Sequence, residues 1–109
     1  GNCFAMRWPA YEVQIAKAVK RGDMVSINHR ITEFLASYFD VIFVYNELTH
    51  PSEKHLIALC EQHCKKLPAN FRVNLEQLFC DMFGRVERIS DDIDKIVNEL
   101  EKLLKSQEV

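Results

Sequence analysis

The chain has 109 residues and a nearly balanced charge, with 14 Lys and Arg residues against 16 Asp and Glu residues. Its length and 48% hydrophobic composition fit one globular domain with one core. A net charge of −2 supplies no positive field for nucleic acid or an anionic membrane, so neither is an expected partner. Because Gly and Pro number only 3 each, we expect an all-α, up-and-down bundle of about five helices.

The start of the chain, residues 1–9, is expected to be an expression scar or linker, followed by a helical domain over residues 10–109. The sequence opens on Gly1 rather than Met, which suggests that the domain belongs to a longer protein. No apolar run approaches the ~20 residues of a membrane-spanning helix, and no basic-then-apolar leader is present. We therefore expect a cytoplasmic protein with no membrane contact.

Two helices are predicted first, over about residues 10–21 and 24–48. Gly22 separates them, and Asp23 is a natural N-cap for the second. Steps of three and four residues between apolar side chains mark the core face of the second helix. These side chains are Ile27, Ile31, Phe34, Leu35, Tyr38, Phe39, Ile42, Phe43 and Tyr45. Pro51 is expected to stop this helix.

Three more helices are predicted in the second half of the chain. One spans about residues 51–67, and the next spans about 71–83, with Gly84 as the residue that follows its end. The last begins at Ser90 as an N-cap, with aspartates in its first turn near the positive end of the helix dipole. Its apolar stripe runs from residue 93 to residue 104.

Four cysteines, Cys3, Cys60, Cys64 and Cys80, raise the possibility of disulfides or a metal site. Cys60 and Cys64 lie four residues apart beside His63, but no second pair with a spacing typical of zinc sites accompanies them. Cys60 instead continues an apolar helix face. We expect packed, reduced cysteines, as in a cytoplasmic protein.

Asn46 interrupts the apolar stripe at the end of the second predicted helix. It follows Phe43 by three residues and Ile42 by four, so it shares their face. A buried amide without partners costs a few kcal/mol. Asn46 therefore either satisfies open carbonyl groups at the helix end or the turn that follows, or it faces a ligand.

Lys54 falls in the first turn of the third predicted helix, where the helix dipole disfavours a cation. One interpretation is a surface lysine paired with Glu53 or Glu47, which contributes little. The other is that Lys54 and the helix N-terminus together face an anion such as a phosphate. Asp40 and Glu47 lie seven residues apart, on a stripe that is usually solvated but could help hold a polar substrate beside Lys54.

The stretch from residue 21 to residue 56 resembles part of a known family. It begins with Arg-Gly-Asp and continues through an aromatic-rich helix that ends in FDVIFVYNELTHPSEKHL. This pattern is similar to the helical domain that follows the catalytic domain in antibiotic-type and related bacterial nucleotidyltransferases. In that family a helix ending in an apolar-Asn pattern, a short turn, Pro and then Lys is a recurring signature. The resemblance covers about residues 10–65.

The resemblance implies that the full protein transfers a nucleoside monophosphate from a nucleoside triphosphate to a hydroxyl-bearing small molecule. The helical domain would close over both substrates, with Asn46 and Lys54 at the nucleotide and Asp40, Glu47 and His50 on the acceptor side. An N-terminal nucleotidyltransferase domain would bind Mg²⁺ through a Gly-Ser turn and an Asp-x-Asp pair. No Gly-Ser occurs in this chain, so no catalytic residue is assigned, and the resemblance implies that the chain would be the accessory half.

Two other classes of function stay open. The apolar stripe over residues 93–104 could dimerise the chain or bind another protein, which would make it a non-enzymatic interaction domain. Histidines on separate helices could also converge on a metal ion. These histidines are His29, His50, His55 and His63.

Overall fold

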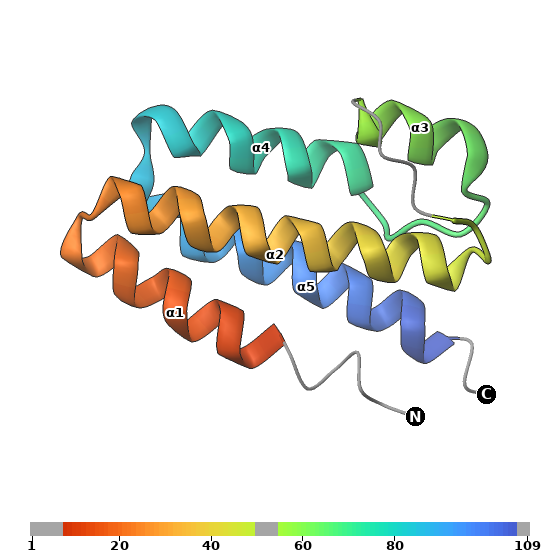
Figure 1. Cartoon of the computed structure of the whole chain (residues 1–109), viewed down its shortest axis with the longest axis horizontal. Helices are drawn as coiled ribbons and strands as arrows, with labels where there is room; N and C mark the ends of the chain where they lie inside the picture. Colours follow the sequence, from red (N-terminus) through yellow and green to blue (C-terminus); the bar gives the residue numbers. More distant parts are fainter. Residues whose placement is uncertain (1–7, 50–54, 107–109) are drawn as a thin grey trace.

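The computed structural model describes residues 8–49 and 55–106. Within these ranges the chain forms five α-helices and one short 3-10 helix (Figure 1). The elements are α1 (Trp8–Arg21), α2 (Met24–Tyr45), α3 (Leu56–His63), α4 (Phe71–Gly84), η1 (Val86–Arg88) and α5 (Ile89–Ser106). The predicted all-α bundle of about five helices is confirmed.

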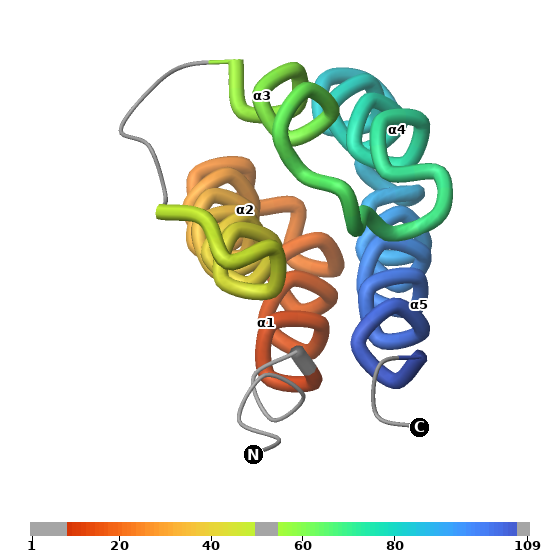
Figure 2. The backbone as a smooth tube through the Cα atoms, turned by 90° about the vertical axis from the view of Figure 1, so that its right-hand side faces the viewer, coloured from red at the N-terminus to blue at the C-terminus, as the bar shows by residue number. Residues whose placement is uncertain are grey.

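The four long helices run alternately up and down the bundle, and the short α3 lies at one end beside the start of α4 (Figure 1). Seen end-on, α1 lies between α2 and α5, while α3 and α4 lie on the opposite side from α1 (Figure 2). Helix α1 packs against both α2 and α5, and α4 packs against α5. The end of α2 and the α4–α5 connection lie at opposite ends of the bundle (Figure 1).

Aromatic side chains join α2 to the start of α4. The Tyr38 ring stacks on Phe34 and on Phe71, with ring centroids 6.0 and 6.3 Å apart. Phe39 makes edge contacts with Tyr38 at 5.5 Å and with Phe71 at 6.3 Å. Aromatic pairs of this kind add to the stabilisation from buried area. Burial also raises the pKa of the Tyr38 phenol.

The turn between α1 and α2 has the structure that the sequence predicts. Gly22 has φ +68°, a left-handed conformation that glycine adopts without a steric penalty. Asp23 caps α2, because its Oδ1 accepts from Ser26 N at 3.2 Å and its Oδ2 accepts from Ser26 Oγ at 2.7 Å. These hydrogen bonds lower the pKa of Asp23.

The helices on either side of residues 50–54 are shorter than predicted. Helix α2 ends at Tyr45 rather than residue 48, and Glu47 has a left-handed φ of 57°. Helix α3 begins at Leu56, after a left-handed His55, and ends at His63 rather than residue 67. Helix α3 ends at His63 because the backbone becomes extended at Cys64. Two residues later, Lys66 N donates a hydrogen bond to the Asn46 side chain at the end of α2.

The start of α5 also differs from the prediction. The 3-10 helix η1 leads directly into it, so Ser90 lies inside the first turn and is not an N-cap. Gly84 is the last residue of α4 rather than the residue that follows it. The apolar stripe of α5 faces the core of this chain, with Ile93 and Leu100 at most 1% exposed.

Candidate functional site

Asn46 cross-links the end of α2 to the segment that follows α3. Its Nδ2 donates to the carbonyl oxygens of Ile42 at 2.8 Å and Lys66 at 2.9 Å. Its Oδ1 accepts from Lys66 N at 2.8 Å. The side chain thus satisfies the Ile42 carbonyl at the end of α2, as one of the two sequence interpretations expects. It also holds the backbone of Lys66, which lies 20 residues further along the chain. Both of its amide N–H bonds are occupied.

This cross-link borders a cavity of about 290 Å³, here called the corner pocket. It is lined by Tyr45, Asn46, Glu47, Leu48, His63, Lys65 and Lys66. Lys66 Nζ lies 5.6 Å from the centroid of the Tyr45 ring, a cation–π distance. Lys65, Lys66 and His63 are exposed, and Glu47 is the carboxylate among the lining residues. The pocket therefore combines polar and apolar surface, with two lysine side chains among its lining residues.

The structure brings together two of the five predicted site residues. Asn46 and Glu47 both line the corner pocket. Asp40 is an exposed residue of α2 and is not among the lining residues. His50 and Lys54 lie outside the described residues. Sequence reasoning missed the lysine pair at 65 and 66, although two adjacent lysines just before Leu67-Pro68 were a visible signal.

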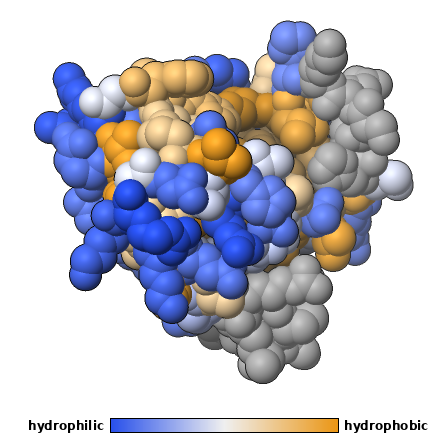
Figure 3. Space-filling model, turned by 60° about the vertical axis from the view of Figure 1, so that its left-hand side comes forward, coloured by the Kyte–Doolittle hydropathy of each residue, from blue (hydrophilic) through white to orange (hydrophobic). Residues whose placement is uncertain are grey.

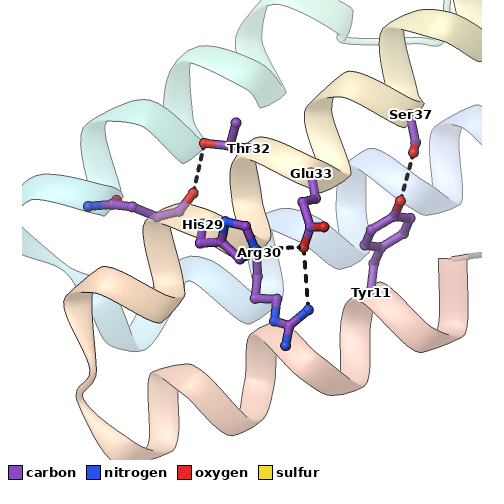
Figure 4. Close-up of polar contacts among 7 residues, drawn as sticks. Tyr11, His29, Arg30, Thr32, Glu33 and Ser37 are labelled. Carbon is purple, nitrogen blue, oxygen red and sulfur yellow. Dashed lines mark hydrogen bonds and ion pairs between the residues drawn. The ribbon is translucent and has the colours of Figure 1, made fainter.

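Glu33 lies seven residues before Asp40 on an exposed face of α2. There Glu33 Oε1 lies 3.4 Å from His29 Nε2 and 3.3 Å from Arg30 Nη1 (Figure 4). Exposed pairs of this kind contribute little to stability. The same view shows Tyr11 of α1 hydrogen-bonded to Ser37 of α2, with 2.7 Å between the two hydroxyl oxygens. The contacts of Glu33 thus join neighbouring residues at the surface, whereas the Tyr11–Ser37 hydrogen bond is partly buried and joins α1 to α2.

An apolar groove of about 580 Å³ lies between α2, α3 and α4. It is lined by Thr32, Leu35, Ala36, Phe39, His55, Leu56, Ile57, Ala58, Arg72 and Phe79. Hydrophobic residues gather across the upper part of the face shown in Figure 3, and hydrophilic residues gather at its lower left. At the groove, Arg72 is paired with Glu61 and with Glu76, the latter at 3.1 Å. The Arg72 guanidinium at the groove is thus paired with two carboxylates of this chain.

Asp81 and Asp92 form a buried carboxyl pair where α4 and α5 meet. They are 1% and 5% exposed. Burial, followed by the hydrogen bond to Asp81 and its charge, raises the pKa of Asp92 from 3.8 to about 7. The same hydrogen bond, together with Gln77 and the charges of nearby arginines, lowers the pKa of Asp81. Asp92 is therefore the group that carries the shared proton.

A second carboxyl pair joins α5 to α1. The hydrogen bond to Asp94, followed by burial and the charges of Asp94 and Glu101, raises the pKa of Glu12 from 4.5 to about 7. Asp92 and Asp94 thus contact different helices, although they are two residues apart on α5. Consequently they do not form a joint cation site of the Asp-x-Asp kind.

These two pairs predict that the chain loses stability as the pH rises from the acidic range to neutrality. A carboxyl group whose pKa is raised by folding contributes stability that is complete below its unfolded pKa and is lost as pH rises through its folded pKa. For Glu12 and Asp92, whose pKa values rise from 4.5 and 3.8 to about 7, that loss runs from about pH 4 to about pH 7. The lowered pKa of Asp81 acts at acidic pH and leaves this range unchanged. We expect the melting temperature to fall between about pH 4 and pH 7.

A double variant provides the control for this pH dependence. Glu12→Gln and Asp92→Asn keep the shape and hydrogen-bonding capacity of both side chains and remove their titration. The melting temperature of the double variant should change far less over the same pH range. An equally steep fall in the variant would show that other groups cause the effect.

The cysteines and histidines supply no reactive centre among the described residues. Cys60 and Cys64 are buried free thiols, and burial is the main cause that raises the pKa of both, to about 12 for Cys60. Cys80 is a free, exposed thiol, and Cys3 lies outside the described residues. Within the part of the chain that the structure describes, no three His, Cys, Asp or Glu side chains are grouped to hold a metal ion.

Comparisons with known proteins found no matching family, curated protein or solved structure. Among the helices described, none is long and apolar enough to cross a membrane.

Proposed function

We propose that this chain is the accessory helical domain of a nucleotidyltransferase, which closes over a nucleotide and a hydroxyl-bearing acceptor. A separate catalytic domain would bind Mg²⁺ and the nucleoside triphosphate and carry out the transfer of the nucleoside monophosphate. The observation that carries the proposal is the corner pocket. The segment whose sequence resembles that family includes Asn46, and Asn46 holds the backbone of Lys66, one of two adjacent lysines at this pocket.

The chemistry of the corner pocket suits a polyphosphate. Lysine ammonium groups are flexible point charges that bind phosphate oxygens, and Lys65 and Lys66 are both exposed at the pocket. His63 adds a third group that can donate to an anion. In this arrangement Asn46 is a positioning residue, because its amide holds Lys66 while the lysine side chains contact the phosphates. The sequence had instead assigned the nucleotide contact to Asn46 itself.

The carboxylates of the chain agree with an accessory role. The Asp-x-Asp pair of the chain is Asp92 and Asp94, and their carboxyl groups are engaged on two different helices. Mg²⁺ demands near-ideal octahedral geometry and is usually held by one or two carboxylates together with phosphate oxygens. These aspartates do not offer such a pair, so the proposal places the metal in the catalytic domain.

Calorimetric titration of the chain with ATP and GTP tests the proposal. The variant Lys65→Ala/Lys66→Ala should bind at least tenfold more weakly, which corresponds to about 1.4 kcal/mol. The matched control is Lys17→Ala/Lys20→Ala, which removes the same charge from exposed positions on α1. Its affinity should equal that of the unmodified chain. Equal losses in both variants, or no nucleotide binding at all, would contradict the proposal.

A non-enzymatic interaction domain is the second candidate, and one observation favours it. Phe83 at the end of α4 is 91% exposed, and Val73 on the same helix is 65% exposed. An exposed phenylalanine ring is a typical contact residue of protein interfaces. The stripe over residues 93–104 that the sequence suggested for dimerisation is used mainly in the core of this chain. A partner would therefore have to bind elsewhere, and α4 offers these residues.

A further inference from the structure

The apolar groove between α2, α3 and α4 continues along α2 beyond the residues that line it. Thr32 and Ala36 line the groove on α2. Val25 precedes them by seven and eleven residues, which are close to two and three whole helical turns, so the three side chains lie within about 40° around the helix axis. Val25 is 80% exposed. The groove therefore extends along α2 as an exposed stripe to the first turn of the helix.

Helix α4 has the same arrangement on the other side of the groove. Arg72 and Phe79 line the groove, and Phe83 follows them by eleven and four residues, which places all three on one face of α4. Phe83 is 91% exposed. Because α2 begins at the end of the bundle where α4 ends, Val25 and Phe83 both lie at that end (Figure 1). An entire aromatic ring thus projects from the face that carries the groove.

Among the described helices, α3 covers this face at one end only. It has 8 residues, whereas α2 has 22, and it lies beside the start of α4, away from Phe83 (Figure 1). Ala36 and Ala58 are exposed at the groove, so their small side chains let another backbone approach. The ion pairs of Glu33 on α2 and of Arg72 on α4 flank the apolar residues. An apolar centre with a polar rim is the usual anatomy of a protein interface.

We propose that two copies of this chain form a dimer through this face, with the Phe83 ring of each copy in the groove of the other. A two-fold symmetric interface uses the same surface on both subunits, so that surface must contain both halves of every contact. This face does, because it carries a projecting ring at one end and an open groove toward the other. A two-fold axis that crosses the helices brings each ring over the α3 end of the partner's groove, beside Leu56 and Ile57. The Arg72 guanidinium there also suits an aromatic ring.

The dimensions of this face match those of a dimer interface. The bundle measures 39 × 28 × 22 Å, and the face runs along its longest axis (Figure 1). A face of 39 by 22 Å covers about 850 Å², close to the ~800 Å² that each partner buries in a standard-size interface. With one aromatic anchor per copy, such an area supports a dissociation constant on the order of tens of micromolar. The chain is therefore monomeric at low micromolar concentrations and dimeric well above them.

This inference is independent of the proposed function, because the corner pocket lies at the other end of the bundle from Phe83 (Figure 1). Sedimentation velocity over protein concentrations from about 2 to about 500 µM tests it. The mass of the sedimenting species should rise from that of one chain toward that of two. A chain that is monomeric at every concentration would leave the groove to a different occupant and overturn the proposal.

Two variants locate the interface. Phe83→Lys removes the ring, and Ala58→Glu places a charge in the groove; both positions are exposed, so both variants should fold. Each should weaken dimerisation at least tenfold. The matched control is Val13→Lys, at a position on α1 that is 52% exposed, and it should dimerise like the unmodified chain. Unchanged dimerisation in both variants, or an equal loss in the control, would overturn the proposal.

A mixture of the two variants tests whether ring and groove meet between copies. In a mixed dimer, the Phe83 ring of the Ala58→Glu chain enters the unmodified groove of the Phe83→Lys chain. At the second contact the two introduced charges have opposite signs and attract each other. The equimolar mixture should therefore dimerise more tightly than either variant alone. No gain on mixing would mean that Phe83 and the groove do not meet across the interface, which would overturn the proposal.

Discussion

Replacing Phe34 with alanine should lower the free energy of unfolding by about 3–5 kcal/mol. Phe34 is 0% exposed, stacks on Tyr38 at 6.0 Å and meets the ring of Tyr11 edge-on at 5.9 Å. Truncation would leave a cavity between α1 and α2 that neighbouring side chains fill only in part. Denaturant unfolding followed by circular dichroism measures the loss.

The same substitution at Phe83 is the matched control. Phe83 is 91% exposed, so Phe83→Ala removes almost no packing and should change the free energy of unfolding by less than about 0.5 kcal/mol. A loss for Phe83→Ala as large as that for Phe34→Ala would mean that Phe83 packs against another molecule. A loss for Phe34→Ala as small as that for Phe83→Ala would mean that Phe34 lies outside the core. The pair of measurements therefore tests the interior of the bundle and the exposure of α4 together.

The second large effect is expected from Asn46→Ala, which should cost about 2 kcal/mol of stability. The variant removes hydrogen bonds to the Ile42 carbonyl and to both backbone groups of Lys66. Because Lys66 N would lose its acceptor, its amide hydrogen should also exchange faster with solvent. Denaturant unfolding and hydrogen exchange of the Lys66 amide provide the two measurements.

Asn98→Ala is the control for this change. Asn98 is exposed on α5, where alanine is the better helix former, so the control should not lose stability. If Asn46 positions the lysine pair for a phosphate, Asn46→Ala should also weaken nucleotide binding without removing any charge. Unchanged exchange at Lys66 would argue against the cross-link, whatever the nucleotide result.

The sequence was sufficient to predict the fold because the main signals are local. Apolar side chains at three- and four-residue steps define the core face of α2, and Gly22 and Asp23 mark where it starts. Periodicity of this kind depends on helix geometry alone. The same reasoning correctly expected Cys60 and Cys64 to pack as free thiols.

The site was predicted less well because it depends on contacts between distant residues. The partner of Asn46 is a backbone 20 residues later, and no spacing rule connects the two. That contact also keeps Lys66 out of α3, so the predicted helix to residue 67 was wrong. The acidic pair Asp81 and Asp92 requires the axial register of α4 and α5, which helix periodicity leaves undetermined.

The carboxyl pairs on α5 also affect how the folded molecule behaves as an electrolyte. The formal net charge of −2 counts every Asp and Glu as ionised. Glu12 and Asp92, with pKa values of about 7, are mostly protonated in slightly acidic solution. Folding therefore takes up protons there, and the native chain carries less negative charge than the unfolded chain. Its isoelectric point is shifted upward by these two groups, so composition alone underestimates the pH at which the folded protein is least soluble.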